Sequence, residues 1–176
     1  MPALTPQPDD REDQAGARLA ELYAAHAAPA RRFAYLLCGN AQQADDIVQE
    51  AFVRVGARIG GLRNPDAFPW YLRRTIRNLL RMQARRESRE RTYAVRLQAV
   101  SVRSASGTGP TEHHEELWRA LRALPERQRA ALVCRLYLDL SERETARILR
   151  CRPGTVKSLV SRGLAALRKD RTLDDR

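Results

Sequence analysis

The stretch SERETARILRCRPGTVKSLVSRGLAALR, residues 141–168, decides the fold that we expect for this chain. Ser141 and Glu144 form a capping box, in which a Ser opens a helix and a Glu follows three residues later. A break of a few residues ends that helix, and Pro153 stands at the start of a second one. A short capped helix followed by a helix with small, polar and basic residues in its first turns has the spacing of a helix-turn-helix unit. The stretch therefore predicts a domain that lays its second helix in the major groove of DNA.

The first turns of that second helix supply the residues that would touch DNA. In a helix-turn-helix unit these positions reach base edges, and the free N–H groups at the helix start favour a phosphate. Any short pair of helices produces a similar pattern, so the motif by itself leaves the function open. The candidate DNA-binding residues are Arg152, Pro153, Thr155, Lys157, Ser158, Ser161 and Arg162.

Two more short helices precede the motif and complete one small domain. Apolar residues recur at helical spacing from Leu117 until Pro125 interrupts the run, and a second run follows. We expect the four short helices to form a domain over residues 112–170. The apolar face of the second helix is expected to contain Ala131, Leu132, Leu136 and Tyr137.

A strongly amphipathic helix is predicted over residues 44–59. Apolar residues recur there every three or four positions, and Gly60-Gly61 closes the helix. The opposite face is acidic, although the chain as a whole is basic. A plain solvated face would explain it, and so would a docking surface for a basic partner protein. This polar face carries Gln42, Asp45, Asp46, Gln49, Glu50 and Arg54.

The next predicted helix combines aromatic residues with a dense run of arginines. Asn64 is its expected N-cap and Pro65 its first residue. Between Tyr71 and Arg91 the sequence holds eight arginines against two glutamates. A basic face can simply be solvated, but neighbouring aromatic rings favour nucleic acid, because rings stack on bases while guanidinium groups hold phosphates. The aromatic residues are Phe68, Trp70 and Tyr71.

The overall charge indicates the same kind of partner. The chain has 176 residues, with 32 Lys and Arg against 21 Asp and Glu, and a formal net charge of +11. Only Lys157 and Lys169 among the basic residues are lysines. A GC-rich coding sequence would explain that ratio, but it would not explain where the charges stand. A basic balance of this size is typical of proteins that meet a polyanion, so nucleic acid is the expected partner.

No pattern in the sequence indicates a metal, a cofactor, a disulfide or a membrane. Cys38, Cys134 and Cys151 are far apart and follow no metal-ligand spacing, so we interpret them as neutral thiols. His26 has no second ligand residue at a useful distance. The sequence has no apolar run of about eighteen residues and no basic, then apolar, N-terminus. We therefore expect the chain to stay in the cytoplasm.

Composition divides the chain into two helical units with flanking segments. Residues 1–17 are acidic and Pro-rich and show no apolar period, so we expect a disordered tail. Residues 92–111 are small, polar and Gly-rich, as linkers are. The expected fold class is all-α, with two small helical domains joined by a flexible linker. These domains are predicted at 18–91 and 112–170, with a second tail at 171–176.

Three stretches together resemble one known family. They are DDIVQEAF at 45–52, NPDAFPWYLRRTIRN at 64–78 and LPERQRAALVCRLYLDLSERETARILRCRPGTVKSLVSRGLAALR at 124–168. In this order they are similar to a bacterial extracytoplasmic-function sigma factor of the sigma-70 superfamily, over roughly residues 19–169. The resemblance implies two helical domains, regions 2 and 4 of that family. It also implies a promoter-specificity subunit of RNA polymerase, without enzymatic activity of its own.

The resemblance implies a role for each surface. The acidic helix would bind the clamp of the largest polymerase subunit through Asp46, Gln49, Glu50 and Phe52. The arginine-rich helix would recognise and melt the minus-ten element and hold a flipped base of the single-stranded non-template strand. The helix-turn-helix would bind the double-stranded minus-thirty-five element. The residues implied at the minus-ten element are Phe68, Trp70, Tyr71, Arg73, Arg74, Arg77, Asn78, Arg81 and Arg85.

The promoter sequence does not follow from the resemblance. Arg152 stands where the family usually has a Ser cap, and Leu159 stands where Arg is frequent. Both positions belong to the recognition unit, so the sequence preference of this chain stays open. For partners, the resemblance adds an anti-sigma factor, which is common in the family, and we expect a monomer when the chain is free.

Two other classes of protein stay as alternatives. A stand-alone helix-turn-helix regulator would carry a dimerisation surface or a ligand pocket in its N-terminal half, and it leaves the aromatic-arginine helix without a purpose. An enzyme acting on nucleic acid would need clustered carboxylates for a metal, or a nucleophile beside convergent arginines. Asp45, Asp46 and Glu50 come nearest to such a cluster, but they are predicted on a surface helix without a basic groove. We therefore expect no catalytic residue and no bound metal.

Overall fold

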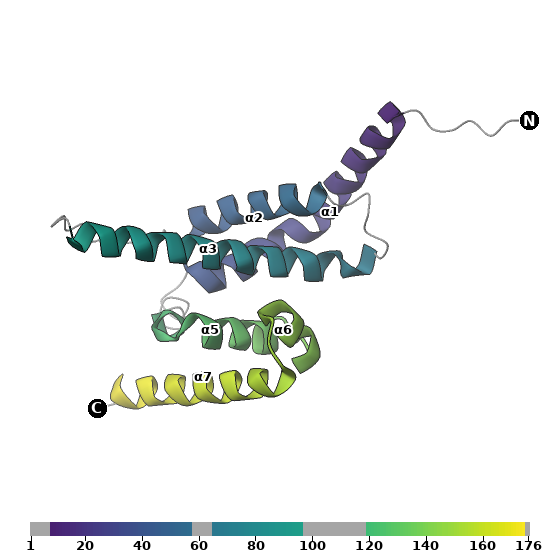
Figure 1. Cartoon of the computed structure of the whole chain (residues 1–176). Coiled ribbons are helices and arrows are strands. Elements are labelled where there is room, and N and C mark those ends of the chain that lie inside the picture. The colour runs from purple at the N-terminus through teal and green to yellow at the C-terminus, as the bar shows by residue number, and fades with distance from the viewer. Residues whose placement is uncertain (1–7, 58–64, 97–118, 175–176) are drawn as a thin grey trace, which may run out of the picture.

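The computed structural model describes residues 8–57, 65–96 and 119–174. Nearly all of these residues are helical, and none of them lies in a β-strand. The expected all-α fold is therefore confirmed. Residues 8–96 form the N-terminal half and residues 119–174 form the C-terminal half, and Figure 1 shows the two halves as separate layers of helices.

Three long helices make up the N-terminal half. They are α1 (Pro8–Cys38), α2 (Ala41–Gly56) and α3 (Phe68–Arg96), with one 3₁₀ turn, η2 (Pro65–Ala67), directly before α3. Gly39 follows α1 with a φ of 71°, and Asn40 caps α2, because its side chain accepts a hydrogen bond from Gln43 N at 2.8 Å. The three helices pack on one another. The apolar period predicted for α2 is confirmed as far as Val55, since its buried residues are Ala44, Ile47, Val48, Ala51, Phe52 and Val55. α2 ends at Gly56, before the predicted stop, and Ile59 and Gly60-Gly61 lie outside the described residues.

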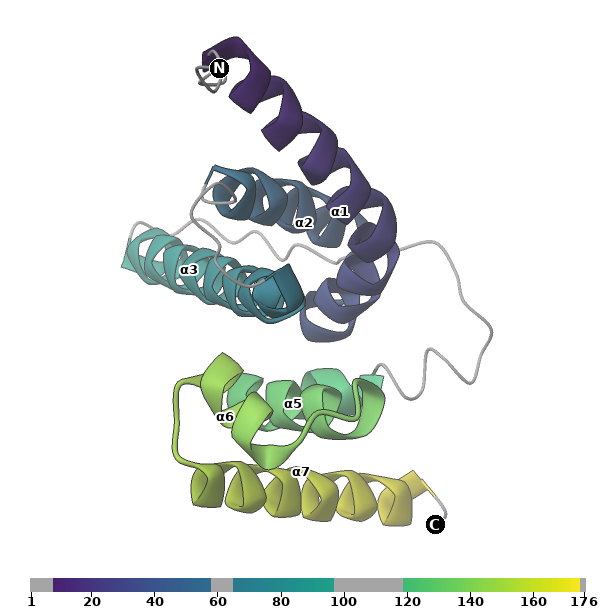
Figure 2. The same ribbon diagram turned by 90° about the vertical axis from the view of Figure 1, so that its right-hand side faces the viewer.

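The start of the chain differs from the sequence-based expectation. The sequence predicts disorder through residue 17, whereas α1 begins at Pro8. A helix that is already formed adds one backbone hydrogen bond for each further residue, so α1 can extend toward its start without an apolar period. α1 also continues through Pro29, and Figure 2 shows that it changes direction along its length.

The C-terminal half is built from shorter helices. Residues 119–123 are helical, and they are followed by α5 (Glu126–Leu132), the π-helical turn η3 (Val133–Tyr137), α6 (Glu142–Leu149) and α7 (Pro153–Asp174). α7 packs against both α5 and α6. Gly163 lets α7 approach α5 closely, because a Cβ atom at this position would lie 2.8 Å from Leu132 Cδ1.

The predicted capping box and helix-turn-helix are confirmed in α6 and α7. Ser141 N donates to Glu144 Oε2 at 2.7 Å, and Glu144 N donates to Ser141 Oγ at 3.2 Å. Arg150 follows α6 in the left-handed region, with a φ of 52°, which turns the chain sharply. Pro153 then opens α7.

One predicted apolar face is wrong at the end of α5. The helical period places Leu136 and Tyr137 inside, but their exposed fractions are 63% and 49%. The cause is the π-helical turn η3, because a π turn contains an extra residue and rotates the following side chains around the axis. Val133 and Cys134 take the buried positions instead, at 3% and 0% exposed.

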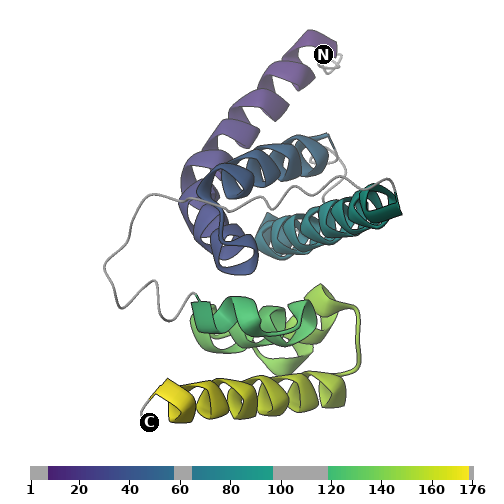
Figure 3. The ribbon, with the colours of Figure 1, turned by 90° about the vertical axis from the view of Figure 1, so that its left-hand side faces the viewer.

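The two halves pack against each other. α3 lies against α6, and α1 contacts α5 and η3, as the face-to-face layers in Figure 3 illustrate. Phe68 and Ile76 from the N-terminal half and Ile148 and Leu149 from the C-terminal half belong to one buried apolar cluster. The predicted linker at 92–111 lies outside the described residues from position 97 onward. The domain limits drawn from the sequence stay predictions, although α3 extends to Arg96 and α7 to Asp174.

Candidate nucleic-acid and partner interfaces

The predicted DNA-binding residues of α7 lie on one face of the helix start. Val156 and Leu159 hold the opposite side in the core, at 0% and 8% exposed, and so fix the direction in which the helix faces. Lys157 Nζ lies 3.9 Å from Glu142 Oε2, a loose surface ion pair that a phosphate can replace. Thr155 is half-buried, and the exposed members of the face are Arg152, Pro153, Lys157, Ser158, Ser161 and Arg162.

Leu159 has a packing reason to be apolar. Its side chain is 8% exposed and joins the same buried cluster as Ile148 and Leu149. A guanidinium at this position would have to be desolvated or to leave the core. Leu159 therefore fits the packing of α7 in this chain.

The acidic face of α2 is exposed, as its amphipathic period predicts. Asp46, Gln49 and Glu50 are all exposed. Gln42 Nε2 donates to Asp46 Oδ1 at 3.1 Å, and Glu50 Oε1 pairs with Arg54 Nη2 at 2.6 Å, each across one helical turn. Exposed pairs of this kind contribute little free energy, so both carboxylates stay available to a partner.

Phe52 lies on the inner side of α2, away from the acidic face. It is 3% exposed, and its ring centroid lies 4.8 Å from that of Tyr23 and 5.8 Å from that of Phe68. Asp45 is engaged with α1, because its Oδ1 lies 3.1 Å from Arg31 Nε. Phe52 therefore holds α2 against the core and forms no part of the exposed acidic face.

The sequence analysis missed Val53, which extends the acidic face. This side chain is 69% exposed and stands one helical turn after Gln49. A signal was present, because the apolar period of α2 uses Phe52 and Val55 and leaves Val53 outside it. An apolar side chain among charged neighbours is a common element of a protein-binding surface.

Eight of the nine predicted residues of α3 fall into two groups, and the ninth, Asn78, is half-buried outside both. The first group is an aromatic cluster at the start of the helix. The Trp70 and Tyr71 ring centroids are 4.5 Å apart, and Arg74 Cζ lies 5.2 Å from the Trp70 ring centroid. Tyr71 is 39% exposed, and Trp70 Nε1 is buried without a hydrogen-bond partner among the described residues. Phe68 is 0% exposed and belongs to the core.

The second group is an arginine row that repeats every four residues along α3 and lies toward the C-terminal half. Arg77, in the middle of the row, is 2% exposed. Its Nη1 donates to the carbonyl oxygens of Ile148 at 3.5 Å and Leu149 at 3.4 Å, and its Nε lies 3.4 Å from Glu126 Oε1. The last carbonyls of a helix have no partner within it, so Arg77 caps α6 from the other half. The members of the row are Arg73, Arg77, Arg81 and Arg85.

Burial changes the electrostatics of this row. Desolvation is the main cause that lowers the pKa of Arg77, and the nearby Glu126 carboxylate partly opposes it. Desolvation also lowers the pKa of Arg73, against the opposite influence of Cys134 and Glu144. An arginine stays protonated throughout the physiological pH range. The lowered pKa values of Arg73 and Arg77 therefore indicate positive charges held in an unfavourable environment.

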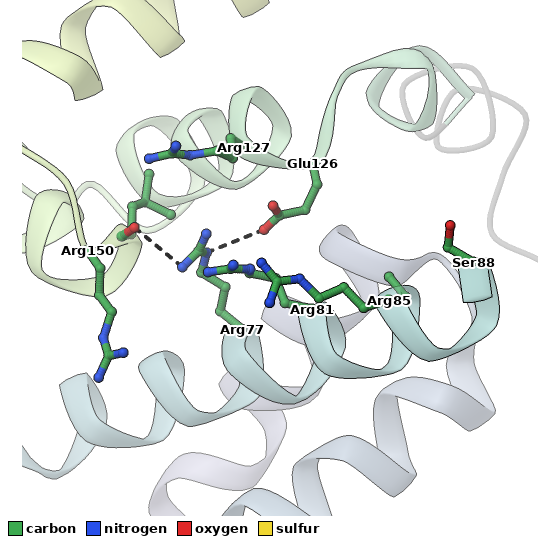
Figure 4. Close-up of a pocket in the computed structure, with 9 residues that line it drawn as sticks. Arg77, Arg81, Arg85, Ser88, Glu126, Arg127 and Arg150 are labelled. Atoms are coloured by element: carbon green, nitrogen blue, oxygen red, sulfur yellow. Dashed lines mark hydrogen bonds and ion pairs between the residues drawn. The ribbon is translucent and has the colours of Figure 1, made fainter. Parts of the chain in front are cut away.

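A cavity of about 540 Å³ opens beside Arg77, between the two halves (Figure 4). Arginines of the row line it from α3, while Arg127 and Arg150 line it from the C-terminal half, together with Glu126. The sequence analysis missed these last three residues as site residues. No local sequence pattern shows which side chains of one half face the other half. Of the three residues, only Arg150 stands at a break between helices that the sequence predicts.

The three cysteines are free thiols. Burial raises the pKa of Cys134 to about 12 and also raises the pKa of Cys38. Both therefore carry no negative charge at neutral pH, in agreement with their interpretation as neutral thiols. Cys151 is half-buried.

The described ranges hold neither a metal-binding cluster nor a membrane-spanning helix. No group of three or more His, Cys, Asp or Glu side chains converges within residues 8–57, 65–96 and 119–174. Within the same ranges, every helix is too short or too polar to cross a bilayer. His113 and His114 lie outside these ranges.

Comparison with known families gives two matches, one for each half. The family described as Sigma-70 region 2 matches residues 22–90, and the family described as Sigma-70, region 4 matches residues 114–167. The first match covers α2, most of α3 and the later part of α1, and the second covers the helix-turn-helix.

Similar proteins extend along most of the chain. The ECF RNA polymerase sigma factor EcfG of Rhodopseudomonas palustris is 36% identical over 137 residues, which are 78% of this chain and 76% of that relative. The ECF RNA polymerase sigma factor SigE of Mycolicibacterium smegmatis is 33% identical over 153 residues, 84% of this chain and 59% of that relative. Among solved structures, the sigma factor RpoE of Bartonella quintana, crystallised with the anti-sigma factor NepR, has a TM-score of 0.67 at 24% identity. The match covers 94% of this chain and 98% of that one, and it shows a common fold.

Proposed function

We proceed from the finding that this chain belongs to the extracytoplasmic-function family of RNA polymerase sigma factors, and we propose which of its surfaces performs each step. As a sigma factor it binds core RNA polymerase, directs promoter recognition and initiates transcription. Its two halves are regions 2 and 4 of the sigma-70 superfamily. We assign it no catalytic step, cofactor or metal, and we place it in the cytoplasm with the polymerase.

The acidic face of α2 is our proposed docking surface for the polymerase clamp. Asp46, Gln49 and Glu50 offer exposed carboxylate and amide groups, and Val53 adds an exposed apolar side chain beside them. Two carboxylates can pair with basic groups of the clamp, and an apolar side chain gains free energy when a partner covers it. In this proposal Phe52 positions the helix from the core.

The start of α3 is our proposed surface for the minus-ten element. Tyr71 offers an aromatic platform on which an unpaired base can stack. The Trp70 ring meets it edge to face, and Arg74 lies over the Trp70 ring. The Trp70 N–H, which has no hydrogen-bond partner among the described residues, is a donor that an incoming nucleotide could satisfy. Phe68 supports the platform from the core. Asn78 and the arginine row would hold the backbone of the single strand.

The burial of the arginine row determines in which order the surfaces can bind their partners. Arg77 caps α6 and is 2% exposed, so it reaches DNA only after the C-terminal half has moved away from α3. The acidic face of α2 and the outer face of α7 need no such movement. We therefore propose that the packed arrangement is the free, monomeric form, and that the halves separate when the chain joins the polymerase.

The outer face of α7 is our proposed reader of the minus-thirty-five element. Lys157 and Arg162 offer cationic donors, and Ser158 and Ser161 stand between them on the same face. This arrangement suits the major groove, where small polar side chains approach base edges and cations hold the flanking phosphates. The positive end of the helix dipole at the start of α7, next to Arg152, favours a phosphate as well.

An inhibitory partner is also part of the proposal. The Bartonella quintana relative was crystallised in complex with an anti-sigma factor. We propose a partner of the same class for this chain.

The observation that carries the proposal is the presence in one chain of an exposed acidic helix, an aromatic-arginine helix and a helix-turn-helix. The test is gel filtration of the chain with bacterial core RNA polymerase, followed by permanganate footprinting on a promoter found by run-off transcription. We expect co-elution, and reactive thymines that depend on the chain. Binding of duplex DNA without co-elution would contradict the proposal and favour a stand-alone helix-turn-helix regulator.

A further inference from the structure

The cavity between the two halves gathers more positive charge than its surroundings neutralise. It has a volume of about 540 Å³ and lies between α3, the start of α5 and the turn from α6 to α7 (Figure 4). Five arginines line it, against the single carboxylate of Glu126. The arginines are Arg77, Arg81, Arg85, Arg127 and Arg150.

These arginines come from both halves of the molecule. Figure 4 shows Arg77 and Arg81 on α3, with Arg127 on the helix across the cavity. In the described part of the chain, the one ion pair among the cavity residues joins Arg77 Nε to Glu126 Oε1 at 3.4 Å. Like charges that are brought together repel, and the repulsion grows where protein replaces water. Closure of the halves therefore carries an electrostatic cost that a multivalent anion would offset.

Arg77 also has a buried N–H group that makes no hydrogen bond within the described residues. The residue is 2% exposed, and its Nε is buried without a hydrogen bond in the described residues, although the Glu126 carboxylate lies 3.4 Å away. A buried N–H group without an acceptor is unfavourable. An anionic oxygen in the cavity would accept a hydrogen bond from this N–H group.

The donor geometry and the size of the cavity favour phosphate. A guanidinium group presents paired N–H donors that match two phosphate oxygens at once. A volume of about 540 Å³ falls within the range of pockets that enclose a nucleotide-sized ligand. Because Arg77 lies between the halves, the ligand must be a compact body that both halves contact, and a long polymer lying across one half does not meet this condition.

We propose that this cavity binds an oligophosphate, either inorganic or carried on a nucleoside, which bridges the two halves and holds them together. Arg127 and Arg150 would bind it from the C-terminal half, and Arg77 and Arg81 from α3. Bound oligophosphate would thereby occupy arginines that we assign to the minus-ten element and keep the chain closed. This consequence for DNA binding rests on the proposed function, whereas the binding of the ligand does not.

The test is isothermal titration of the full-length chain, without polymerase or DNA, using inorganic tripolyphosphate and GTP as probes. The informative variant is Arg127→Gln with Arg150→Gln, because both arginines line the cavity and neither belongs to a surface proposed above. The matched control is Arg143→Gln with Arg147→Gln, which removes the same charge from exposed positions of α6. Failure of this test is distinguishable from failure of sigma activity, which is measured separately by co-elution with the polymerase.

We expect saturable binding of at least one probe, weakened about tenfold or more in the cavity variant and less than about twofold in the control, because each bidentate arginine contact with phosphate is a strong interaction. Tighter binding of GTP would identify a nucleoside polyphosphate as the ligand class, and equal binding would identify the phosphate chain itself. Absence of saturable binding would overturn the proposal. Equal losses in both variants, or equal competition by an oligoglutamate of the same charge, would overturn it as well, because the cavity would then select charge alone.

Discussion

α2 and α3 are neighbouring helices of the same half, but the C-terminal half affects their functional faces differently. The acidic face of α2 is fully open, with Asp46, Glu50 and Val53 exposed. On α3 the aromatic cluster reaches the surface through Tyr71, whereas Arg77 is 2% exposed and caps α6. Under the proposed function, the packed chain is therefore ready to dock on a protein before it is ready to hold a single strand of DNA.

The largest effect is expected for substitutions in the acidic face of α2, which test whether this face docks on the polymerase. Asp46→Arg together with Glu50→Arg should lower the affinity for core RNA polymerase by about 1,000-fold, because like charges placed across an interface cost several kcal/mol. Both residues are exposed, so the helical content should not change. A pull-down with core polymerase and a circular dichroism spectrum measure the two quantities.

A charge-matched control separates docking from net charge. Glu21→Arg with Glu90→Arg makes the same change at exposed positions of α1 and α3. This variant should bind the polymerase like the unaltered chain. If both variants bind equally well, the acidic face of α2 is not the docking surface.

The covered face of α3 gives the second prediction. Arg77→Ala should destabilise the packing of the two halves by about 3 kcal/mol, because it leaves Glu126 and the last carbonyls of α6 without their partner. The free chain should expand, as measured by small-angle scattering, and amide exchange in α6 should become faster. Arg86→Ala on the exposed side of the same helix should change neither quantity. Equal scattering curves for all three proteins would mean that Arg77 does not hold the halves together.

Much of this arrangement follows from local signals in the sequence. The apolar period of α2 predicted its six buried residues, and the spacing of Ser141 and Glu144 predicted the capping box at the start of α6. Both signals are complete within a few helical turns, so no distant residue can change them. In α7, the apolar period that contains Val156 defined the buried side of the helix, and the exposed side followed from it in the same way.

The covered face of α3 could not be predicted in this way. In the sequence, Arg77 looks like every other arginine of its helix, and its burial depends on Ile148, Leu149 and Glu126, which come much later in the chain. The exposure of Leu136 escaped prediction for a related reason, because a π turn changes the helical period without a clear residue signature. A fixed helical period in the sequence predicts neither the contacts between distant segments nor a local change of helical pitch.

The third prediction extends the comparison to α7, which is open like α2. Lys157→Ala with Arg162→Ala should weaken binding to duplex minus-thirty-five DNA about tenfold and lower the slope of log affinity against log salt by about two, because each of these two cations is expected to neutralise one phosphate. Since this face is exposed in the packed chain, the free protein already shows the effect. Unchanged footprints and an unchanged salt slope would remove α7 from the DNA-binding surface.

The smallest expected effect concerns His26, which lies on α1 with its ring against the start of α3. Its ring centroid is 5.4 Å from that of Phe68, and burial, with a smaller contribution from Arg73, lowers its pKa below the usual value. The unfolded chain therefore takes up a proton at a higher pH than the folded chain does. The neutral ring contributes its full stability above the usual pKa of about 6.5, and that contribution is lost as the pH falls from there toward the folded pKa.

The melting temperature should accordingly fall between pH 7.5 and 5.5, and His26→Gln should make that part of the curve flatter. The same histidine reports on the arginine row, because the charge of Arg73 contributes to the shift. Arg73→Gln should raise the pKa of His26, which the ring proton signals in an NMR titration measure directly. An unchanged histidine titration would show that the field of the arginine row does not reach α1, and that burial of the ring against Phe68 of α3 alone accounts for the lowered pKa of His26.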